Sequence, residues 1–543
     1  MKGHKYIFVV GGVMSGVGKG ISTASIGTIL QSMGNKVNLM KVDPYLNVDA
    51  GTMNPKEHGE TFVMNSGLET DQDMGNYERF LNRDLSTADY LTSGMVYKHV
   101  IDRERQGKYG GNCVEAIPHI RDEILRRYEK SGVLNKSDVT IVEIGGTIGD
   151  YQNIMFMEAA RVLKLKNPKD VLFIMVSYLP IPQTLGEMKT KPTQNAIRQL
   201  NSYGIQADFI IARSSVPLDA RRKEKLAIQC NVQKENVISA PDIESIYDVP
   251  INFEKDKIGE MIAEELNLKN PKANLTDWKK FVSKTKNTKK ALKIAVVGKY
   301  FDTGDFVLSD SYLSVIEAIK YSSYYEGVKA ELTWINSKKY DDNPKLVKEL
   351  ADFDGVIVPG GFGETGIEGK MAAIKFVREN KIPYLGLCYG MQLMTIEYAR
   401  NVLGIKDAQT AEINPDGKNC VIDMMPDQKE KIARGEFGGT MRLGEYPCFL
   451  RKGTIAEKAY GKSLISERHR HRYEVNPEYI AQLEDSGLIF SGTSKDKRLM
   501  EIAELSKKSH PFMLGTQFHP EFKARPLSPH PLFTEFVRVA KKK

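Results

Sequence analysis

The chain has 543 residues, of which 41% are hydrophobic and 27% charged, so two to four folded domains are expected and disorder throughout is excluded. The 77 basic and 69 acidic residues give a net charge of +8, which permits anionic ligands without indicating nucleic acid or a membrane surface. No apolar run approaches the roughly 18 residues of a membrane span. Five scattered cysteines argue against a disulfide framework or zinc cluster and predict a cytoplasmic protein: Cys113, Cys230, Cys388, Cys420 and Cys448.

The first half of the chain alternates apolar, strand-like runs with stretches of helical period. The expected strands are 6–11, 37–42, 139–144, 171–176, 208–212 and 237–240. The expected helices include 21–32, 154–164 and 195–203. Alternation of this kind predicts an α/β fold with a mostly parallel sheet covered on both faces.

A polar stretch, residues 269–290, interrupts the alternation with eight lysines and Pro271, and we interpret it as a linker with a short helix around Trp278. The alternation then resumes, with strands expected at 292–297, 332–335, 355–358 and 384–387 and helices at 313–321 and 371–380. The sequence thus predicts two domains, 1–268 and 291–543, each with a mostly parallel sheet flanked by helices.

A glycine-rich loop follows the first expected strand and precedes the first helix, in the run Gly11-Gly12-Val13-Met14-Ser15-Gly16-Val17-Gly18-Lys19-Gly20. Backbone N–H groups at a helix start bind phosphate, and Lys19 can reach terminal phosphates. The strict P-loop pattern fails, because Val13 replaces its first glycine and Gly20 follows the lysine. A glycine-rich turn with an exposed lysine is the weaker interpretation, given the strand-loop-helix context.

Magnesium at such a loop needs hard oxygen ligands, and two carboxylates are candidates. Asp73 lies in an acidic cluster, and Glu143 ends an expected strand, where ligands bind in open α/β sheets. Each could equally be a helix cap or an ion-pair partner. A second anion cradle is possible at the start of a helix, formed by Lys189, Thr190, Lys191, Pro192, Thr193 and Gln194.

The second half contains the pieces of a cysteine nucleophile site. Gly386-Leu387-Cys388-Tyr389-Gly390 after a strand is the cysteine form of the nucleophile elbow. His519 can take the thiol proton and Glu521 can orient the imidazole. The run Gly360-Gly361-Phe362-Gly363 offers N–H groups for an oxyanion hole. Each piece alone has a structural explanation, but their combination favours acyl transfer.

These motifs resemble two known protein families. The Pro359–Gly363, Gly386–Gln392 and Phe518–Glu521 blocks are similar to class I glutamine amidotransferases. The first domain resembles the amidoligase of the CTP synthase family, a P-loop fold similar to dethiobiotin synthetase. The blocks that carry this likeness are 11–20, 41–49, 58–60, 143–147 and 189–194. The resemblance covers essentially the whole chain and implies ATP-dependent amination of UTP to CTP with ammonia from glutamine, through phosphorylated UTP.

The resemblance also implies roles for individual residues. Cys388, His519 and Glu521 would be the catalytic triad, and His58 would lie near the ammonia passage. ATP would bind Gly16, Val17, Gly18, Lys19, Gly20, Ile21, Asp73, Glu143 and Asp242, with Mg²⁺ on Asp73 and Glu143. UTP, or CTP as feedback inhibitor, would bind Ser15, Asp150, Tyr151, Gln152, Lys189, Thr190, Lys191, Pro192, Thr193, Gln194 and Lys225. Glutamine would bind Gly361, Tyr389, Gly390, Met391, Gln392, Glu412 and Arg472.

Two departures from the family pattern concern regulation. Thr365 stands where the family commonly has an arginine linked to GTP activation, and Gln152 stands where it commonly has a glutamate in the CTP pocket. The strengths of GTP activation and CTP inhibition are therefore open. The family likeness further implies a cytoplasmic homotetramer with no nucleic-acid or membrane partner.

Two other functions would account for part of the sequence. A cobyrinate-type amide synthase pairs related domains but gives no reason for residues 189–194 or for a full triad. A P-loop nucleotide switch would need no thiolate beside His519 and Glu521. A glutaminase assay separates a switch from the two synthases.

Overall fold

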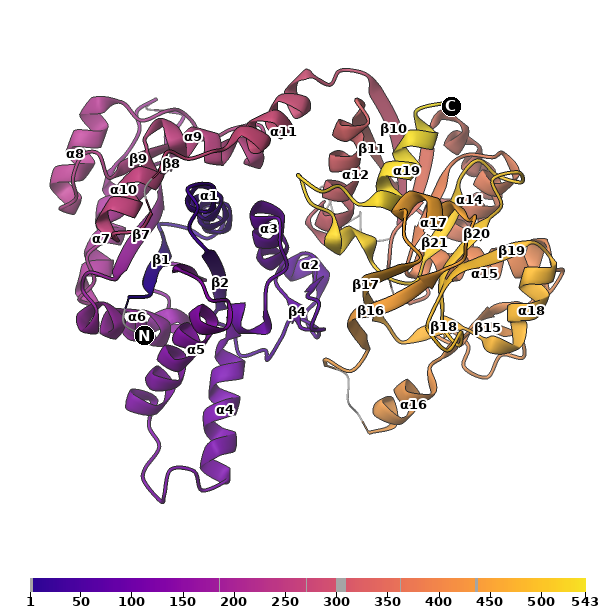
Figure 1. Ribbon diagram of the computed structural model, residues 1–543, viewed down its shortest axis with the longest axis horizontal. Coiled ribbons are helices and arrows are strands. Elements are labelled where there is room, and N and C mark those ends of the chain that lie inside the picture. Colours follow the sequence, from indigo (N-terminus) through magenta and orange to yellow (C-terminus); the bar gives the residue numbers. More distant parts are fainter. Residues whose placement is uncertain (1–2, 185, 270, 299–308, 362, 435–437) are drawn as a thin grey trace. The chain divides into compact units, whose positions relative to one another are not determined.

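The computed structural model describes residues 3–184, 186–269, 271–298, 309–361, 363–434 and 438–543 (Figure 1). The chain divides into two compact units. The first contains residues 1–49 and 73–282, and the second contains residues 50–72 and 283–543. The expected domain boundaries at 268 and 291 stay predictions. Each unit is described by itself below.

The first unit is built on a parallel sheet of strand order β5-β2-β6-β1-β7-β8-β9. Its strands are β1 Lys5–Gly12, β2 Val37–Asp43, β5 Tyr90–Thr92, β6 Val139–Ile144, β7 Val171–Tyr178, β8 Phe209–Ser214 and β9 Val237–Pro241. Their near-continuous apolar runs are typical of strands buried on both faces. The chain leaves β1 toward β2 on one side and later crosses to β7 on the other, which places a topological switch point at the carboxyl end of β1.

Helices cover both faces of this sheet. Alternate residues of β1, such as Tyr6 and Phe8, join a buried core with α5 Arg121–Leu134, α6 Ile154–Lys166 and α7 Lys191–Ser202. α1 Lys19–Ser32 packs with α9 Val249–Lys255 and α10 Ile258–Glu265. Other α-helices that lie mostly in this unit are α3 Gln72–Leu81, α4 Ser93–Arg105, α8 Ala220–Cys230 and α11 Thr276–Asn287.

The lysine-rich stretch expected to be a linker is partly folded onto the first unit. Trp278 of α11 is 2% exposed, and its indole Nε1 donates to the carbonyl of Tyr247 at 2.7 Å. Its ring also packs near Phe80, with centroids 5.0 Å apart. The short helix expected around Trp278 is therefore longer than predicted and anchored by its aromatic face.

The second unit contains a mixed sheet of order β11-β10-β12-β13-β21-β20-β19-β16-β17. Its parallel part is β10 Ala291–Gly298, β11 Lys329–Asn336, β12 Gly355–Val358, β13 Tyr384–Leu387 and β21 Met513–Thr516. An antiparallel part continues from β21 through β20 Met500–Leu505, β19 Leu488–Thr493, β16 Arg442–Leu450 and β17 Leu464–His471. The α/β class is confirmed, and the strand spacing did not predict this antiparallel part.

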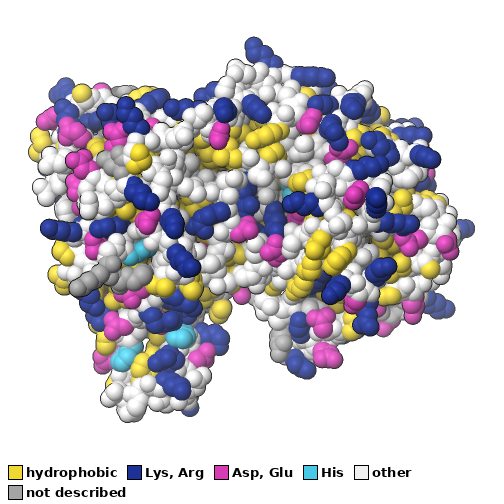
Figure 2. Space-filling view, in the orientation of Figure 1, with side chains coloured by type: hydrophobic (Ala, Val, Ile, Leu, Met, Phe, Trp, Pro, Cys, Tyr) yellow, Lys and Arg dark blue, Asp and Glu magenta, His cyan; other side chains and the backbone are white. Residues whose placement is uncertain are grey.

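The second unit also contains several α-helices. They include α12 Leu313–Tyr325, α14 Ile367–Glu379, α15 Tyr389–Asn401, α16 Pro426–Ala433, α18 Pro477–Asp485 and α19 Pro531–Ala540. Two smaller sheets are formed by β14 Gln409–Thr410 with β15 Cys420–Met424 and β18 Tyr473–Val475, and by β3 Phe62–Val63 with β4 Glu69–Thr70. None of the described helices is both long and apolar enough to cross a bilayer. Basic and acidic side chains are interspersed on the face drawn in Figure 2.

Candidate functional site

The phosphate loop lies at the switch point of the first sheet. Gly16 and Gly18 have φ of 68° and 89°, a conformation that favours glycine, and α1 begins at Lys19. The Lys19 Nζ donates to the carbonyl of Gly146 at 2.9 Å, and burial lowers the pKa of this lysine. A Cβ on Gly11 would lie 2.9 Å from that Nζ. Glycines therefore allow the left-handed turns of this loop and leave room for the buried Lys19 ammonium beside it.

The departure from the strict P-loop pattern has a structural cause. A Cβ built on Gly20 would collide with the carboxylate of Asp73. The serine or threonine of the strict pattern therefore cannot occupy this position, since an acidic residue from α3 approaches the helix there.

Two carboxylates converge beside the loop. The Nζ of Lys41 on β2 lies 2.5 Å from Asp73 Oδ2 and 2.9 Å from Glu143 Oε1. Burial would raise the pKa of Asp73, but the Lys41 ammonium outweighs this effect and holds the pKa below its usual value. For Glu143 the effect of burial is the larger one, and its pKa is raised. Two hard oxygen donors next to a phosphate loop fit Mg²⁺, which takes one or two carboxylates together with phosphate oxygens. Among the described residues no group of three or more metal-ligating side chains occurs.

A cavity of about 300 Å³ opens beside the same loop. It is lined by Gly18 and Ile21 of the loop and α1, and by Arg213, Asp242 and Phe253. Asp242 Oδ1 accepts a hydrogen bond from Arg213 Nη2 at 2.8 Å. An apolar pocket with a few polar groups, continuous with a phosphate loop, suits a nucleotide base.

The second anion cradle is only partly enclosed. Thr193 and Gln194 are buried in the first turn of α7, where Thr193 Oγ1 accepts from Ser177 at 2.8 Å. Lys189 Nζ donates to Glu187 Oε2 at 2.7 Å. Thr190 is also buried, and its Oγ1 accepts from Gln194 Nε2 at 3.1 Å. The other candidates for this site are exposed or half-exposed, with Tyr151 at 90%: Ser15, Asp150, Tyr151, Gln152, Lys191, Pro192 and Lys225. Their joint role in one binding site stays a prediction.

The candidate nucleophile lies at a strained turn. Cys388 separates β13 from α15 with φ 49° and ψ −98°, and is 5% exposed. A Cβ on Gly390 would collide with the carbonyl of Val358, and one on Gly386 would lie 2.7 Å from the Gly390 carbonyl carbon. Glycines on both sides therefore allow the sharp turn, and the turn directs the thiol to the start of α15.

His519 and Glu521 complete a relay with this thiol. Nδ1 of His519 lies 2.6 Å from Glu521 Oε1, so Nδ1–H donates to the carboxylate and Nε2 is left for the thiol. Burial alone would lower the pKa of His519, but the Glu521 carboxylate and the hydrogen-bonded Cys388 raise it to about 10. A protonated imidazole beside the sulfur stabilises a thiolate.

Other groups also contact the thiol. Gln517 Nε2 donates to Cys388 Sγ at 3.6 Å, and Sγ lies 3.7 Å from the carbonyl oxygen of Arg470. A cavity of about 80 Å³ adjoins the thiol, lined in part by Gly360, Gly361 and His519. Gln517 was not predicted as a site residue, although it directly precedes the Phe518-His519 block.

Residues 50–72 form one wall of that cavity, through Pro55, Glu60 and Thr61. Glu60 accepts hydrogen bonds from Ser314 at the start of α12, and Glu69 Oε1 accepts from Arg470 Nε at 2.8 Å. The sequence did not predict Glu60 or Glu69 as site residues, although Glu60 belongs to the block 58–60 that carries part of the family likeness. His58 itself is exposed at the end of α2 Pro55–His58.

The candidate glutamine ligands make the following contacts within the second unit, and Gly361 among them lines the cavity beside the thiol. Gly363 N donates to Glu412 Oε1 at 2.7 Å, and Gln392 Nε2 donates to the carbonyl of Tyr473 at 3.0 Å. Arg472 donates to Gln428 at 2.7 Å and to Thr440 at 3.0 Å. Tyr389, Gly390 and Met391 form the buried first turn of α15. Phe362 of the expected oxyanion loop lies outside the described residues.

Comparison with known proteins matches both halves of the chain. The family description "CTP synthase N-terminus" matches residues 5–268, and "Glutamine amidotransferase class-I" matches residues 307–539. The chain is 48% identical to a CTP synthase of Caldanaerobacter subterraneus over 98% of both chains, and 49% identical to one of Carboxydothermus hydrogenoformans over 99% of both. A solved glutaminase domain of Trypanosoma brucei CTPS with bound acivicin covers 46% of this chain and 94% of its own, at 35% identity and a TM-score of 0.42. The near-full-length identity shows that the chain belongs to the CTP synthase family.

Proposed function

We propose that the chain converts UTP, ATP, glutamine and water into CTP, ADP, phosphate and glutamate. Membership of the CTP synthase family supports this reaction, and so does the presence of a nucleophilic thiol site and a phosphate loop in one chain. We assign the two half-reactions to a synthetase domain over 1–268 and a glutaminase domain over 291–543, joined by residues 269–290.

In the glutaminase half, Cys388 attacks the side-chain amide carbon of glutamine. His519 already holds the proton of the thiol as an imidazolium beside the thiolate, and it gives this proton to the leaving nitrogen, so that ammonia departs and a glutamyl thioester remains. Water then hydrolyses the thioester to glutamate, with His519 again moving the proton and Glu521 holding the imidazole. The glycine-rich run 360–363 supplies N–H groups toward the oxyanion. Glutamine itself is held by Gly361, Gln392, Glu412 and Arg472.

In the synthetase half, ATP phosphorylates O4 of the uracil ring and ammonia then displaces phosphate at C4. Lys19 and the loop N–H groups of residues 16–20 hold the ATP phosphates, and Asp242 lies in the pocket assigned to adenine. Asp73 and Glu143 would hold Mg²⁺, which neutralises phosphate charge when bound. Ser15, Lys225 and residues 189–194 are assigned to UTP. His58 is assigned to the passage of ammonia.

Regulation and assembly follow from the family likeness alone. We propose a cytoplasmic homotetramer that is inhibited by CTP at the UTP residues, including Asp150 and Gln152. We also propose GTP as an allosteric activator, and Thr365, at the place of the family's arginine, as the position that sets the strength of this activation.

The observation that carries the proposal is that Cys388, His519 and Glu521 line one cavity, with His519 Nδ1 bonded to Glu521. The test is product analysis with UTP, ATP, Mg²⁺ and glutamine, omitting each component in turn. CTP should form only with the complete mixture, and free ammonia should replace glutamine. A complete mixture that yields no CTP would refute the proposal.

A further inference from the structure

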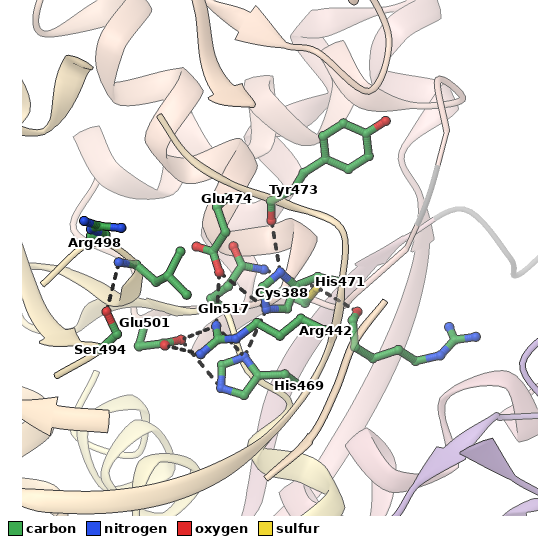
Figure 3. A network of polar contacts seen from close by, with 12 residues as sticks. Cys388, Arg442, His469, His471, Tyr473, Glu474, Ser494, Arg498, Glu501 and Gln517 are labelled. Carbon is green, nitrogen blue, oxygen red and sulfur yellow. Dashed lines mark hydrogen bonds and ion pairs between the residues drawn. The ribbon is translucent and has the colours of Figure 1, made fainter. Parts of the chain in front are cut away.

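A buried polar cluster lies behind the cysteine site and has no part in the proposed chemistry (Figure 3). We call Arg442, His469, His471, Glu474 and Glu501 the Arg442 cluster. His469 and Glu501 are 0% exposed, and His471 is 2% exposed. Burying so many polar groups is costly unless they are paired in a defined geometry, so the cluster fixes the backbone that carries it.

Arg442 is the cation of this cluster. Its guanidinium donates to Glu501 Oε1 at 2.7 Å and to Glu474 Oε1 at 3.1 Å. Burial and the neighbouring Glu501 raise the pKa of Glu474 well above its usual value. Burial and Arg442 lower the pKa of both imidazoles well below the usual value, so His469 and His471 are neutral.

The hydrogen bond to Tyr473 fixes the tautomer of His471. The carbonyl oxygen of Tyr473 can only accept, so His471 Nδ1, 3.1 Å away, carries the proton. His471 Nε2 lies 3.0 Å from His469 Nδ1, and that atom also lies 3.3 Å from Arg442 Nη1. The two rings therefore connect Arg442 to the backbone of the β17–β18 turn.

This connection reaches the proposed glutamine site through one carbonyl group. The Tyr473 oxygen accepts from His471 and also from Gln392 Nε2, at 3.0 Å. Gln392 Nε2 lies 3.2 Å from Gln517 Oε1, and Gln517 Nε2 donates to the thiol of Cys388. Arg472, which we assign to glutamine binding, stands between His471 and Tyr473 in the sequence. The hydrogen bond from His471 to the Tyr473 carbonyl therefore closes a turn that carries Arg472.

We propose that His471 is a positioning residue for the glutamine half-reaction, because its Nδ1–H bond to the Tyr473 carbonyl holds the turn that carries Arg472 and orients Gln392 and Gln517 toward Cys388. The inference rests on the proposed function. It assigns no chemical step to His471, which is separated from the thiol by two amide side chains.

The test compares His471→Asn with His471→Gln in the full-length enzyme. Asparagine places its amide N–H near the position of Nδ1 and keeps the bond to Tyr473, whereas glutamine places its amide near Nε2. We expect His471→Gln to raise the KM for glutamine about tenfold or more, as loss of one well-placed hydrogen bond does. His471→Asn should stay within about threefold of the wild type, and both variants should keep CTP synthesis from free ammonia.

His530→Gln is the matched control, since His530 is equally buried in the same unit and its Nε2 lies 3.0 Å from Glu467 Oε1. It should leave the KM for glutamine unchanged. Equal KM values for the two His471 variants would overturn the inference, and so would a parallel loss of ammonia-dependent synthesis. A wild-type enzyme that forms no CTP from ammonia would instead refute the proposed function.

Discussion

The phosphate-loop region and the cysteine region differ in how complete they are without ligands. In the first, charged groups neutralise one another, with Lys41 between Asp73 and Glu143 and Lys19 on a backbone carbonyl. In the second, a strained turn presents Cys388 to an imidazole whose orientation Glu521 already fixes. If the proposed ATP and Mg²⁺ bind in the first region, they must replace these ion pairs, whereas the thiol, imidazole and carboxylate of the second region already have the order that the proposed mechanism uses.

The sharpest way to separate the regions is Cys388→Ala. Without the thiol no thioester forms, so glutamine-dependent CTP synthesis should fall at least about a thousandfold. Synthesis from free ammonia should persist, because the phosphate-loop region is untouched. Cys448→Ala, at a buried cysteine of the same unit, is the control and should retain both activities. A folded Cys388→Ala enzyme that ammonia cannot rescue would contradict two separate sites.

Lys19→Met should have the complementary effect. The buried ammonium is the cation nearest the proposed ATP phosphates, so CTP synthesis should fall about a hundredfold with either glutamine or ammonia. Glutamine hydrolysis without nucleotides should not change. Lys164→Met removes another lysine of the first unit that donates to a carbonyl, that of Val171, and serves as control. Equal activity of the Lys19 and Lys164 variants would remove the loop from the proposed ATP site.

Glu521→Gln tests how far the cysteine region is organised in advance. The Glu521 carboxylate raises the pKa of His519 to about 10, so the imidazole is protonated at neutral pH. Removing that charge lowers the pKa, and the imidazolium then loses its proton at lower pH. We expect kcat/KM for glutamine to fall about tenfold to a hundredfold at neutral pH.

The alkaline limb of the glutaminase pH profile should also move to lower pH in Glu521→Gln. Glu504→Gln is the control, because Glu504 is buried in the same unit and accepts from the backbone N–H groups of Ile455 and Ala456 rather than from a histidine. An unchanged pH profile in Glu521→Gln would show that the carboxylate does not set the pKa of His519.

The two regions also differ in how well the sequence predicts them. The phosphate loop and the nucleophile elbow are local, strand-turn-helix patterns, so their elements could be predicted from spacing and glycines. The packing of residues 50–72 onto the second unit could not, because it depends on contacts across some 400 residues. Arg468 is an example: it is 0% exposed, and its guanidinium donates to Asn65 at 2.5 Å and to the carbonyl of Val63 at 3.0 Å.

The Arg442 cluster also depends on contacts that the sequence does not predict. Of the arginines and histidines at 468–472, the family likeness gives a role to Arg472 alone. In the structure, alternate residues of β17 face opposite sides, so His469 and His471 enter the core while Arg470 bonds Glu69. Strand periodicity predicts the alternation, but the partners Arg442 and Glu501 come from strands whose pairing the sequence does not reveal.

The smallest effect is expected at Thr365, which is exposed just before α14. If the cysteine region is organised apart from this segment, an arginine there should add a contact for GTP phosphates without altering the relay. Thr365→Arg should then lower the GTP concentration for half-maximal stimulation about tenfold, as one charge-assisted hydrogen bond does. Glutamine hydrolysis without GTP should not change, and Thr365→Met should match the wild type. A rise in GTP-free hydrolysis in Thr365→Arg would instead show that this segment restrains the thiol site, and the contrast between the two regions would then be one of degree.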